Sequence, residues 1–72
     1  MKKVTLLIPV YNEEAMLPTL YQRLIELINR NSTYAWEILF INDGSSDRTL
    51  DVIRQLRQTD SRVNFVNLSR NF

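Results

Sequence analysis

The feature that most constrains this chain is an apolar run that breaks abruptly into a polar turn. Residues 38–41 read Ile-Leu-Phe-Ile, and residues 42–47 read Asn-Asp-Gly-Ser-Ser-Asp. Gly44 is the only glycine among the 72 residues, and a residue without Cβ adopts positive φ at little cost in a sharp turn. Asp43 stands where a buried strand would end. Open α/β proteins bind ligands at the carboxyl ends of parallel strands, so we expect the function at this turn.

Another apolar run lies near the start of the chain. Residues 4–10 are nearly all apolar and rich in β-branched side chains, which is typical of a parallel strand that helices cover on both faces. Pro9 is tolerated there at an edge or where the ladder ends. After Asn12, a candidate cap, we expect a short irregular segment over 13–17 and then a helix to about Arg30.

The remaining elements follow from apolar spacing and turn residues. An apolar stripe with helical spacing marks the first helix, and it consists of Leu17, Leu20, Tyr21, Leu24, Ile25 and Ile28. We predict a strand over 36–41, a helix over 47–58 capped by Ser45 or Ser46, and a strand over 62–68. The inward face of the second helix carries Thr49, Val52, Ile53 and Leu56. The order β-α-β-α-β predicts an α/β fold with parallel strands and right-handed connections.

Composition excludes several classes of site. The chain has no histidine and no cysteine, which excludes a Ser-His-Asp mechanism, a thiolate nucleophile, a disulfide framework and His-ligated metals. A single glycine excludes a P-loop or a G-x-G-x-x-G phosphate cradle. The net charge of +1 gives no footprint for nucleic acid. No segment has the roughly 20 apolar residues that a membrane span needs, and the start lacks a signal-peptide cleavage site.

Polar side chains follow all three predicted strands, and parallel strands bring them to one edge of the sheet. The three groups are Pro9, Tyr11, Asn12 and Glu13; Asn42, Asp43, Gly44 and Ser45; and Ser69, Arg70 and Asn71. A carboxylate can accept hydrogen bonds from a base or a ribose, an aromatic ring can stack on the base, and an arginine can bind a phosphate. This combination favours a nucleotide over a free sugar or a peptide.

Each of these side chains also has a structural interpretation. Tyr11 could simply pack, Glu13 could answer the dipole of the first helix, and Asp43 could bond its own backbone in a turn. Asp47 is better explained as a helix-start acid than as a functional group, and Arg70 is open in either direction. Asp51 and Asp60 are interpreted as solvated, and Met16 and Trp36 as packing residues.

Three segments carry a resemblance to a known family: residues 7–14 (Leu-Ile-Pro-Val-Tyr-Asn-Glu-Glu), 41–49 (Ile-Asn-Asp-Gly-Ser-Ser-Asp-Arg-Thr) and 68–72 (Leu-Ser-Arg-Asn-Phe). In this order and spacing they resemble the amino-terminal part of family 2 glycosyltransferases of the GT-A fold. The likeness is strongest to transferases that load a sugar onto undecaprenyl or dolichyl phosphate. It implies that residues 1–72 are the nucleotide-sugar-binding part of a three-layer, Rossmann-like domain.

The resemblance also implies partners and roles. The donor would be a nucleoside-diphosphate sugar such as a UDP- or GDP-sugar, with Mg²⁺ or Mn²⁺ at its pyrophosphate, and the acceptor a polyprenyl phosphate. By position, Pro9, Tyr11 and Glu13 would line the nucleoside pocket, Asp43 would contact the base, and Arg70 would approach a phosphate, as would the neighbouring Asn71. The family often has Asp-Asp before the glycine, whereas here the first of the pair is Asn42.

Length is the main departure from the family pattern. The metal-binding Asp-x-Asp motif, the catalytic base and the usual transmembrane helices of the family lie beyond Phe72, so we expect no catalytic residue and no metal ligand in this chain, and no activity from it alone. The full-length protein would act at the cytoplasmic face of the cell membrane, in cell-envelope synthesis. Without a fourth strand beside it, residues 4–10 become an apolar edge, and we expect self-association or partial folding.

Two other classes remain as alternatives. One is a small flavodoxin-like or receiver-like regulatory module, and the other is an interaction module without catalysis. A receiver needs an acidic pair after its first strand and a phospho-acceptor aspartate after its third. This chain has Tyr11-Asn12-Glu13 after the first strand and Asp43 after the second, which argues against the receiver.

Overall fold

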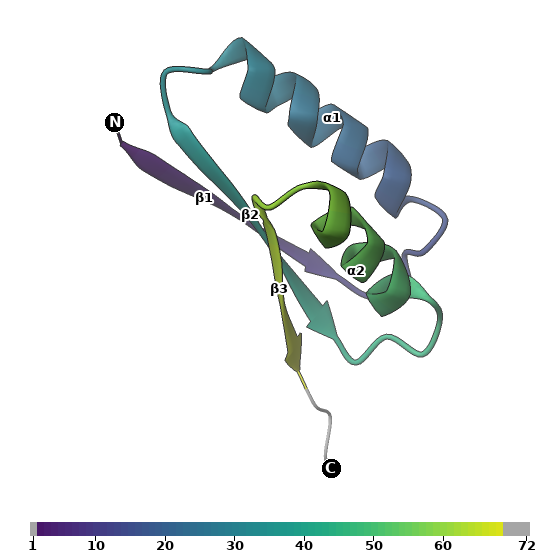
Figure 1. Ribbon diagram of the computed structural model, residues 1–72. Helices are drawn as coiled ribbons and strands as arrows, with labels where there is room; N and C mark the ends of the chain where they lie inside the picture. The colour runs from purple at the N-terminus through teal and green to yellow at the C-terminus, as the bar shows by residue number, and fades with distance from the viewer. Residues whose placement is uncertain (1, 69–72) are drawn as a thin grey trace.

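The computed structural model describes residues 2–68 and contains five elements. They are β1 (Lys3–Val10), α1 (Leu17–Arg30), β2 (Ala35–Asp43), α2 (Thr49–Thr59) and β3 (Val63–Leu68). The strands form one parallel sheet in the order β1-β2-β3, with the helices packed beside it (Figure 1). The predicted β-α-β-α-β fold with parallel strands is confirmed.

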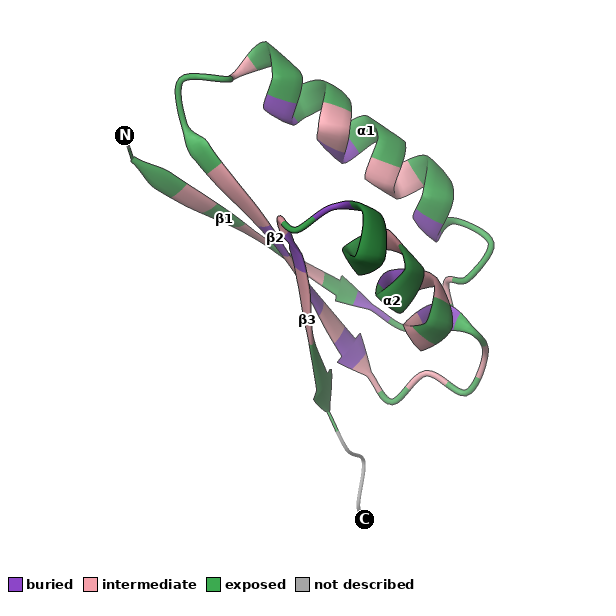
Figure 2. Ribbon diagram, in the orientation of Figure 1, coloured by how far each residue is buried: buried purple, intermediate pink, exposed green. Residues whose placement is uncertain are grey.

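Both helices lie on the same face of the sheet (Figure 1). Two crossovers of one hand that each advance the chain by one strand in the same direction must place their helices on the same side. Burial along β1 therefore alternates (Figure 2), and Leu7 is 63% exposed on the other face. The expectation that both faces of residues 4–10 are covered is not met within residues 2–68, which supply two layers.

The core lies between the helices and the sheet. Its buried apolar side chains are Val10, Leu17, Leu24, Ile28, Ile38, Phe40, Ile53 and Val63. The predicted stripe of the first helix is confirmed, because Leu20, Tyr21 and Ile25 pack against the same cluster. Thr49 and Ile53 are fully buried on the inward face of α2, as the spacing predicted.

The helix starts differ from the sequence-based expectation. α2 begins at Thr49 rather than at residue 47, and neither helix receives a hydrogen bond from a side chain at its N-cap. The predicted capping by Asn12 and by Ser45 or Ser46 is therefore wrong. These side chains bond between the two loops instead, as described below. A turn in which the carbonyl of Glu13 accepts the N–H groups of Met16 and Leu17 leads into α1.

The strand β1 is an edge of the described sheet, and Pro9 fits it for a specific reason. The N–H of Ala35 donates to the carbonyl of Lys2, so the even-numbered residues of β1 point their backbone groups at β2 and the odd-numbered ones point them outward. Pro9 is odd-numbered. Its missing N–H therefore removes no hydrogen bond between β1 and β2.

A polar cluster closes the opposite end of the sheet. Asp60 is only 9% exposed and accepts from the Tyr21 hydroxyl (2.6 Å) and from Nε and Nη2 of Arg62 (2.9 and 2.8 Å). The Arg62 guanidinium holds the pKa of the Asp60 carboxyl well below its usual range against the opposing effect of burial. The interpretation of Asp60 as solvated was wrong, because this carboxylate joins α1 to the start of β3.

The two residues predicted to pack, Trp36 and Met16, differ in their burial. Trp36 packs against the core and its indole N–H donates to the carbonyl of Asn31 (2.8 Å), which confirms its packing role. Met16 is 61% exposed, so its interpretation as a packing residue was wrong. Within residues 2–68, neither helix is both long and apolar enough to cross a membrane.

Candidate functional site

The β1–α1 loop and the β2–α2 loop are bonded together at the carboxyl edge of the sheet. Three consecutive main-chain N–H groups of the first loop donate to side chains of the second: Asn12 to Ser45 Oγ (2.9 Å), Glu13 to Thr49 Oγ1 (2.8 Å) and Glu14 to Asp47 Oδ2 (3.2 Å). The main-chain N–H groups of residues 12–14, which precede α1, are thereby occupied from within the protein.

Asn12 returns the contact through its side chain. Its Oδ1 accepts the N–H groups of Ser46 (2.8 Å) and Asp47 (3.3 Å). Its backbone is left-handed, with φ of 50°, a conformation that Asn tolerates better than most residues because its short polar side chain bonds locally. Gly44, in the facing loop, has φ of 67° and meets the predicted need for a residue without Cβ at the turn.

Thr49 is the buried part of this contact, and Asp47 lies half-buried beside it. Thr49 is fully buried, and both its N–H (2.9 Å) and its hydroxyl donate to Asp47 Oδ1. Desolvation raises the pKa of the Asp47 carboxyl, but the hydrogen bonds from Thr49 and from the Glu14 N–H outweigh it and hold that pKa below its usual value. Asp47 is therefore a structural carboxylate, as the sequence indicated: it accepts the N–H of the first residue of α2 and also bonds to the β1–α1 loop.

Asn42 fixes the ends of β2 and β3 relative to each other. It is 4% exposed, its Nδ2 donates to Asn67 Oδ1 (2.9 Å), and its Oδ1 accepts the Ser45 hydroxyl (2.5 Å). A carboxylate at this position could accept but could not donate. The amide therefore makes use of both ends of its side chain where the family often has a second aspartate.

The predicted nucleoside-binding residues lie together at this edge. The register pairs Val10 with Asn42, so Tyr11 and Asp43 leave adjacent strands at the same level. Tyr11 is 49% exposed, which argues against packing as its main role, and Asp43 is half-buried. Glu13 is half-buried and lies four residues before α1, outside the first turn where it would answer the helix dipole.

Pro9 and Arg70 were also predicted to bind the nucleotide. Pro9 is exposed on the face of the sheet away from the helices. Arg70 lies outside the described residues, as do its neighbours Ser69 and Asn71, so the structure does not place the phosphate-directed part of the prediction.

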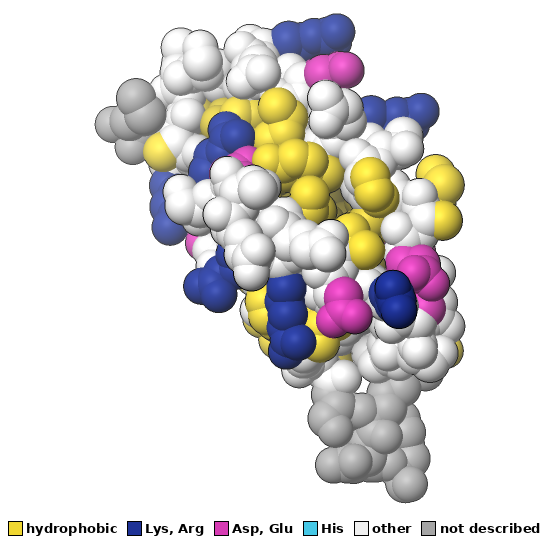
Figure 3. Space-filling model, turned by 45° about the vertical axis from the view of Figure 1, so that its right-hand side comes forward, with side chains coloured by type: hydrophobic (Ala, Val, Ile, Leu, Met, Phe, Trp, Pro, Cys, Tyr) yellow, Lys and Arg dark blue, Asp and Glu magenta, His cyan; other side chains and the backbone are white. Residues whose placement is uncertain are grey.

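A hollow of about 420 Å³ opens between the ends of β2 and β3 and the start of α2, and none of the residues predicted to bind the nucleoside lines it. Its lining is mainly polar or acidic: Asn42, Gly44, Ser45, Asp47, Leu50, Asp51, Asn67 and Leu68. In Figure 3, Asp and Glu side chains lie among Lys and Arg side chains in the lower part of the described surface. The polar and acidic lining of the hollow suits a ligand that donates hydrogen bonds.

The same edge is poorly suited to a phosphate. Helix N-termini bind anions through unoccupied N–H groups. Here the N–H groups of Ser46, Asp47 and Thr49 already bond to side-chain oxygens, as do those of residues 12–14. Within the described part of the chain, no group of three acidic side chains is placed to hold a metal ion.

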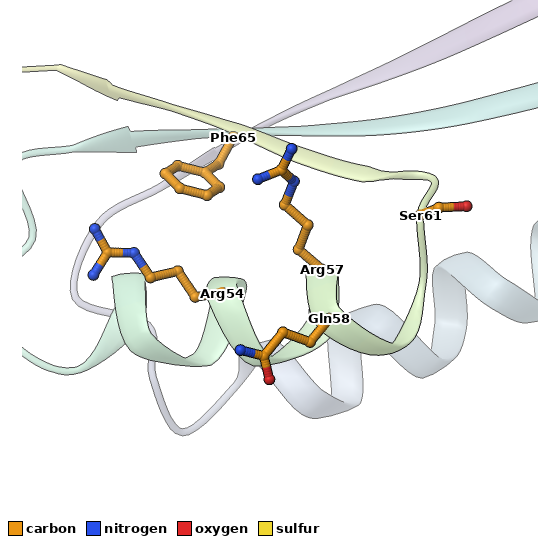
Figure 4. A pocket seen from close by; sticks show the side chains of 5 residues that line it. All are labelled: Arg54, Arg57, Gln58, Ser61 and Phe65. Atoms are coloured by element: carbon orange, nitrogen blue, oxygen red, sulfur yellow. The ribbon is translucent and has the colours of Figure 1, made fainter.

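A larger hollow lies elsewhere. It measures about 530 Å³ and is lined by Arg54, Arg57, Gln58, Ser61 and Phe65. Figure 4 shows these side chains on α2, on β3 and on the connection between them. The hollow therefore lies beside the outer edge of the sheet and includes none of the residues predicted to bind the nucleoside.

Sequence reasoning missed the roles of Asn12 and Thr49. Asn12 was interpreted as a cap and Thr49 as part of an apolar face, because spacing along one segment does not reveal a partner 33 to 36 positions away. A signal was present in the polar residues themselves, since a buried threonine in a helix needs a hydrogen-bond partner.

Comparison with known proteins connects this geometry to a family. The family model described as glycosyl transferase family 2 matches residues 5–72. The chain is 41% identical over 68 residues to the uncharacterized glycosyltransferase YkcC of Bacillus subtilis. The aligned residues make up 94% of this chain and 21% of that relative. The chain is 42% identical over 72 residues to the undecaprenyl-phosphate 4-deoxy-4-formamido-L-arabinose transferase of Salmonella choleraesuis, covering 99% and 22% respectively.

A third relative is similar to the same degree. The putative glycosyltransferase CsbB of Bacillus subtilis is 42% identical over 69 residues, which is 96% of this chain and 21% of that protein. The chain thus spans about a fifth of the length of the curated relatives it matches. Since the family model covers nearly all of the 72 residues, the chain belongs to glycosyltransferase family 2.

Proposed function

We propose that this chain binds the nucleoside of a nucleoside-diphosphate sugar for a glycosyltransferase. The proposal rests on one observation: Tyr11, Glu13 and Asp43 follow adjacent strands at one edge of the sheet. They lie there beside main-chain N–H groups that already donate to side chains of the protein. An exposed aromatic ring offers a stacking surface, and carboxylates accept hydrogen bonds from base N–H and ribose hydroxyl groups. Pro9 completes the first-strand side of this pocket.

The diphosphate is directed away from these two loops. Their main-chain N–H groups are occupied, and a phosphate beside Asp43, Asp47 and Glu13 would meet like charge. In the proposed full-length enzyme Mg²⁺ or Mn²⁺ would neutralise the diphosphate, and its ligands would come from outside residues 2–68. Within residues 2–68, no group of three acidic side chains is placed to hold such an ion.

The proposed acceptor is a polyprenyl phosphate. The name of the Salmonella relative specifies an undecaprenyl-phosphate sugar transferase, and its likeness covers 99% of this chain. The full-length protein would then transfer the sugar at the cytoplasmic face of the membrane, whereas residues 1–72 alone would bind the donor without catalysis.

A titration of the chain with UDP, GDP and their sugar conjugates, followed by protein NMR, tests the donor proposal. Asp43→Ala is the test variant. Glu26→Ala is the matched control, because Glu26 is an exposed carboxylate on α1. Saturable shifts around Tyr11 that Asp43→Ala removes and Glu26→Ala leaves in place support the proposal. A folded chain that binds none of the four ligands refutes it.

We also propose that the isolated chain self-associates through β1. Its outward N–H and C=O groups at residues 3, 5 and 7 form a template for another strand. Leu7, which is 63% exposed, adds apolar surface next to that edge. Because β1 pairs with β2 on only one side within residues 2–68, this template is accessible.

A further inference from the structure

We propose that Asn12 is a positioning residue that holds the two halves of the nucleoside pocket in one arrangement. The inference rests on the proposed function of this edge. Asn12 lies between Tyr11 and Glu13, which belong to one half. Its side chain bonds to the turn that directly follows Asp43, which belongs to the other half.

Asn12 both donates to and accepts from the facing turn, and these bonds reach three consecutive residues of that turn. The Asn12 N–H donates to Ser45 Oγ (2.9 Å) while its Oδ1 accepts from the Ser46 and Asp47 N–H groups (2.8 and 3.3 Å). A shift of the β2–α2 turn therefore strains three hydrogen bonds to one residue. Asp43 lies two residues before Ser45, so the position of its carboxylate relative to Tyr11 is set through this residue.

The backbone of Asn12 serves the same purpose. Among residues 2–68 it is the one non-glycine residue with positive φ. The left-handed conformation bends the chain immediately after Tyr11, and the Asn12 carboxamide lies against the facing loop. A residue here must both adopt this conformation and present a side-chain acceptor, and those two requirements can be separated by substitution.

Three variants separate them. Asn12→Gly keeps the left-handed conformation accessible but removes the acceptor. Asn12→Asp keeps an acceptor oxygen and also tolerates the left-handed region. Asn31→Gly is the control, because Asn31 also makes one side-chain hydrogen bond, to the Leu27 carbonyl (2.9 Å), at the far end of α1.

The test is the dissociation constant of UDP or GDP, whichever the wild-type chain binds, measured at a temperature where thermal unfolding curves show every variant fully folded. Under that condition a role in global stability alone cannot change the affinity. We expect Asn12→Gly to weaken binding about tenfold, the equivalent of one to two ordinary hydrogen bonds. Asn12→Asp and Asn31→Gly should remain within about threefold of wild type.

Amide hydrogen exchange without nucleotide gives a second readout. Asn12→Gly should speed exchange at Ser46 and Asp47, the two N–H donors that lose their acceptor, and Asn31→Gly should not. Faster exchange with unchanged affinity would assign Asn12 to structure alone and overturn the inference. Unchanged exchange would overturn it as well. If a folded wild-type chain binds no nucleotide, the proposed function fails first, and this inference fails with it.

Discussion

Replacing Thr49 with valine tests the contact that joins the two loops. Valine has nearly the same shape as threonine but lacks the hydroxyl. In the structure that hydroxyl accepts the Glu13 N–H at 2.8 Å and donates to Asp47 Oδ1, and Thr49 is fully buried. Thr49→Val therefore leaves the Glu13 amide without its acceptor and removes one donor from the Asp47 carboxylate.

The size of the effect follows from these two losses. A hydrogen bond to a charged group contributes about 1.5–3 kcal/mol, and a buried donor left unsatisfied costs about 1–3 kcal/mol. Because both losses come from removing the same hydroxyl, they do not simply add. We therefore expect Thr49→Val to lower the free energy of unfolding by about 2–4 kcal/mol. Thr49→Ser keeps the hydroxyl and loses one methyl group, for which we expect about 1 kcal/mol.

Such a loss is large for a domain of this size. At roughly 0.05–0.15 kcal/mol per residue, a 72-residue domain has about 4–11 kcal/mol in total. A change of 1 kcal/mol shifts the Tm of a domain this small by about 4–8 °C. Thr49→Val should therefore lower the Tm by about 8–32 °C.

The assay is urea unfolding followed by circular dichroism, with all variants at one protein concentration. We expect the midpoint to fall in the order wild type, Thr49→Ser, Thr49→Val, with an unchanged m-value. If Thr49→Val is as stable as wild type, or more stable than Thr49→Ser, the hydroxyl does not join the loops and the reasoning is refuted.

Two further predictions concern the rest of the fold. Asp60→Asn should lower the free energy of unfolding at pH 7 by about 2 kcal/mol, at the modest end for a buried pair, because the Arg62 side chain is 38% exposed. The folded-state pKa of Asp60 is depressed, so its contribution is complete above the unfolded pKa of about 3.9 and is lost as the pH falls below that value. The difference between variant and wild type in pH-dependent urea unfolding should shrink over the same window, and a constant difference would contradict the ion pair. Leu7→Lys, which places a charge next to the β1 edge, should shift the chain toward monomer in light scattering after size exclusion, whereas a monomeric wild-type chain would contradict self-association.

The order of elements was predictable because each has a clear period. The stripe from Leu17 to Ile28 repeats at helical spacing, and the runs around Ile8 and Phe40 are too short and too β-branched for helices. Both predictions depend only on neighbours along the chain. The uncovered second face of β1 was not predictable in this way, because an apolar residue such as Leu7 does not specify which layer will cover it.

The positions of Tyr11, Glu13 and Asp43 were predictable for a topological reason. Parallel strands bring their carboxyl ends to one edge whatever the details of the loops, and the register of β1 and β2 places these residues together. Whether they bind a nucleotide stays a prediction. The resemblance of the motifs to family 2 glycosyltransferases is confirmed by the family match over residues 5–72.

The bonding inside the site was not predictable from local rules. Polar residues before a helix are usually caps, and that rule failed for Asn12, Ser45 and Ser46 because each found a partner on the other loop. The same limit applies to Asp60, whose partner Tyr21 lies 39 positions earlier in the chain. A loop aspartate is solvated unless the fold brings it such a donor.

The most direct test of the central claim is the affinity of the folded chain for UDP and GDP, compared between wild type and Asp43→Ala by NMR titration. We expect saturable binding of one nucleotide by the wild type, with shifts at Tyr11, Glu13 and the Asp43 turn. Asp43→Ala should abolish this binding, whereas Glu26→Ala should retain it. Equal binding by wild type and Asp43→Ala, or none by a folded wild-type chain, would contradict the assignment of this edge to the nucleoside.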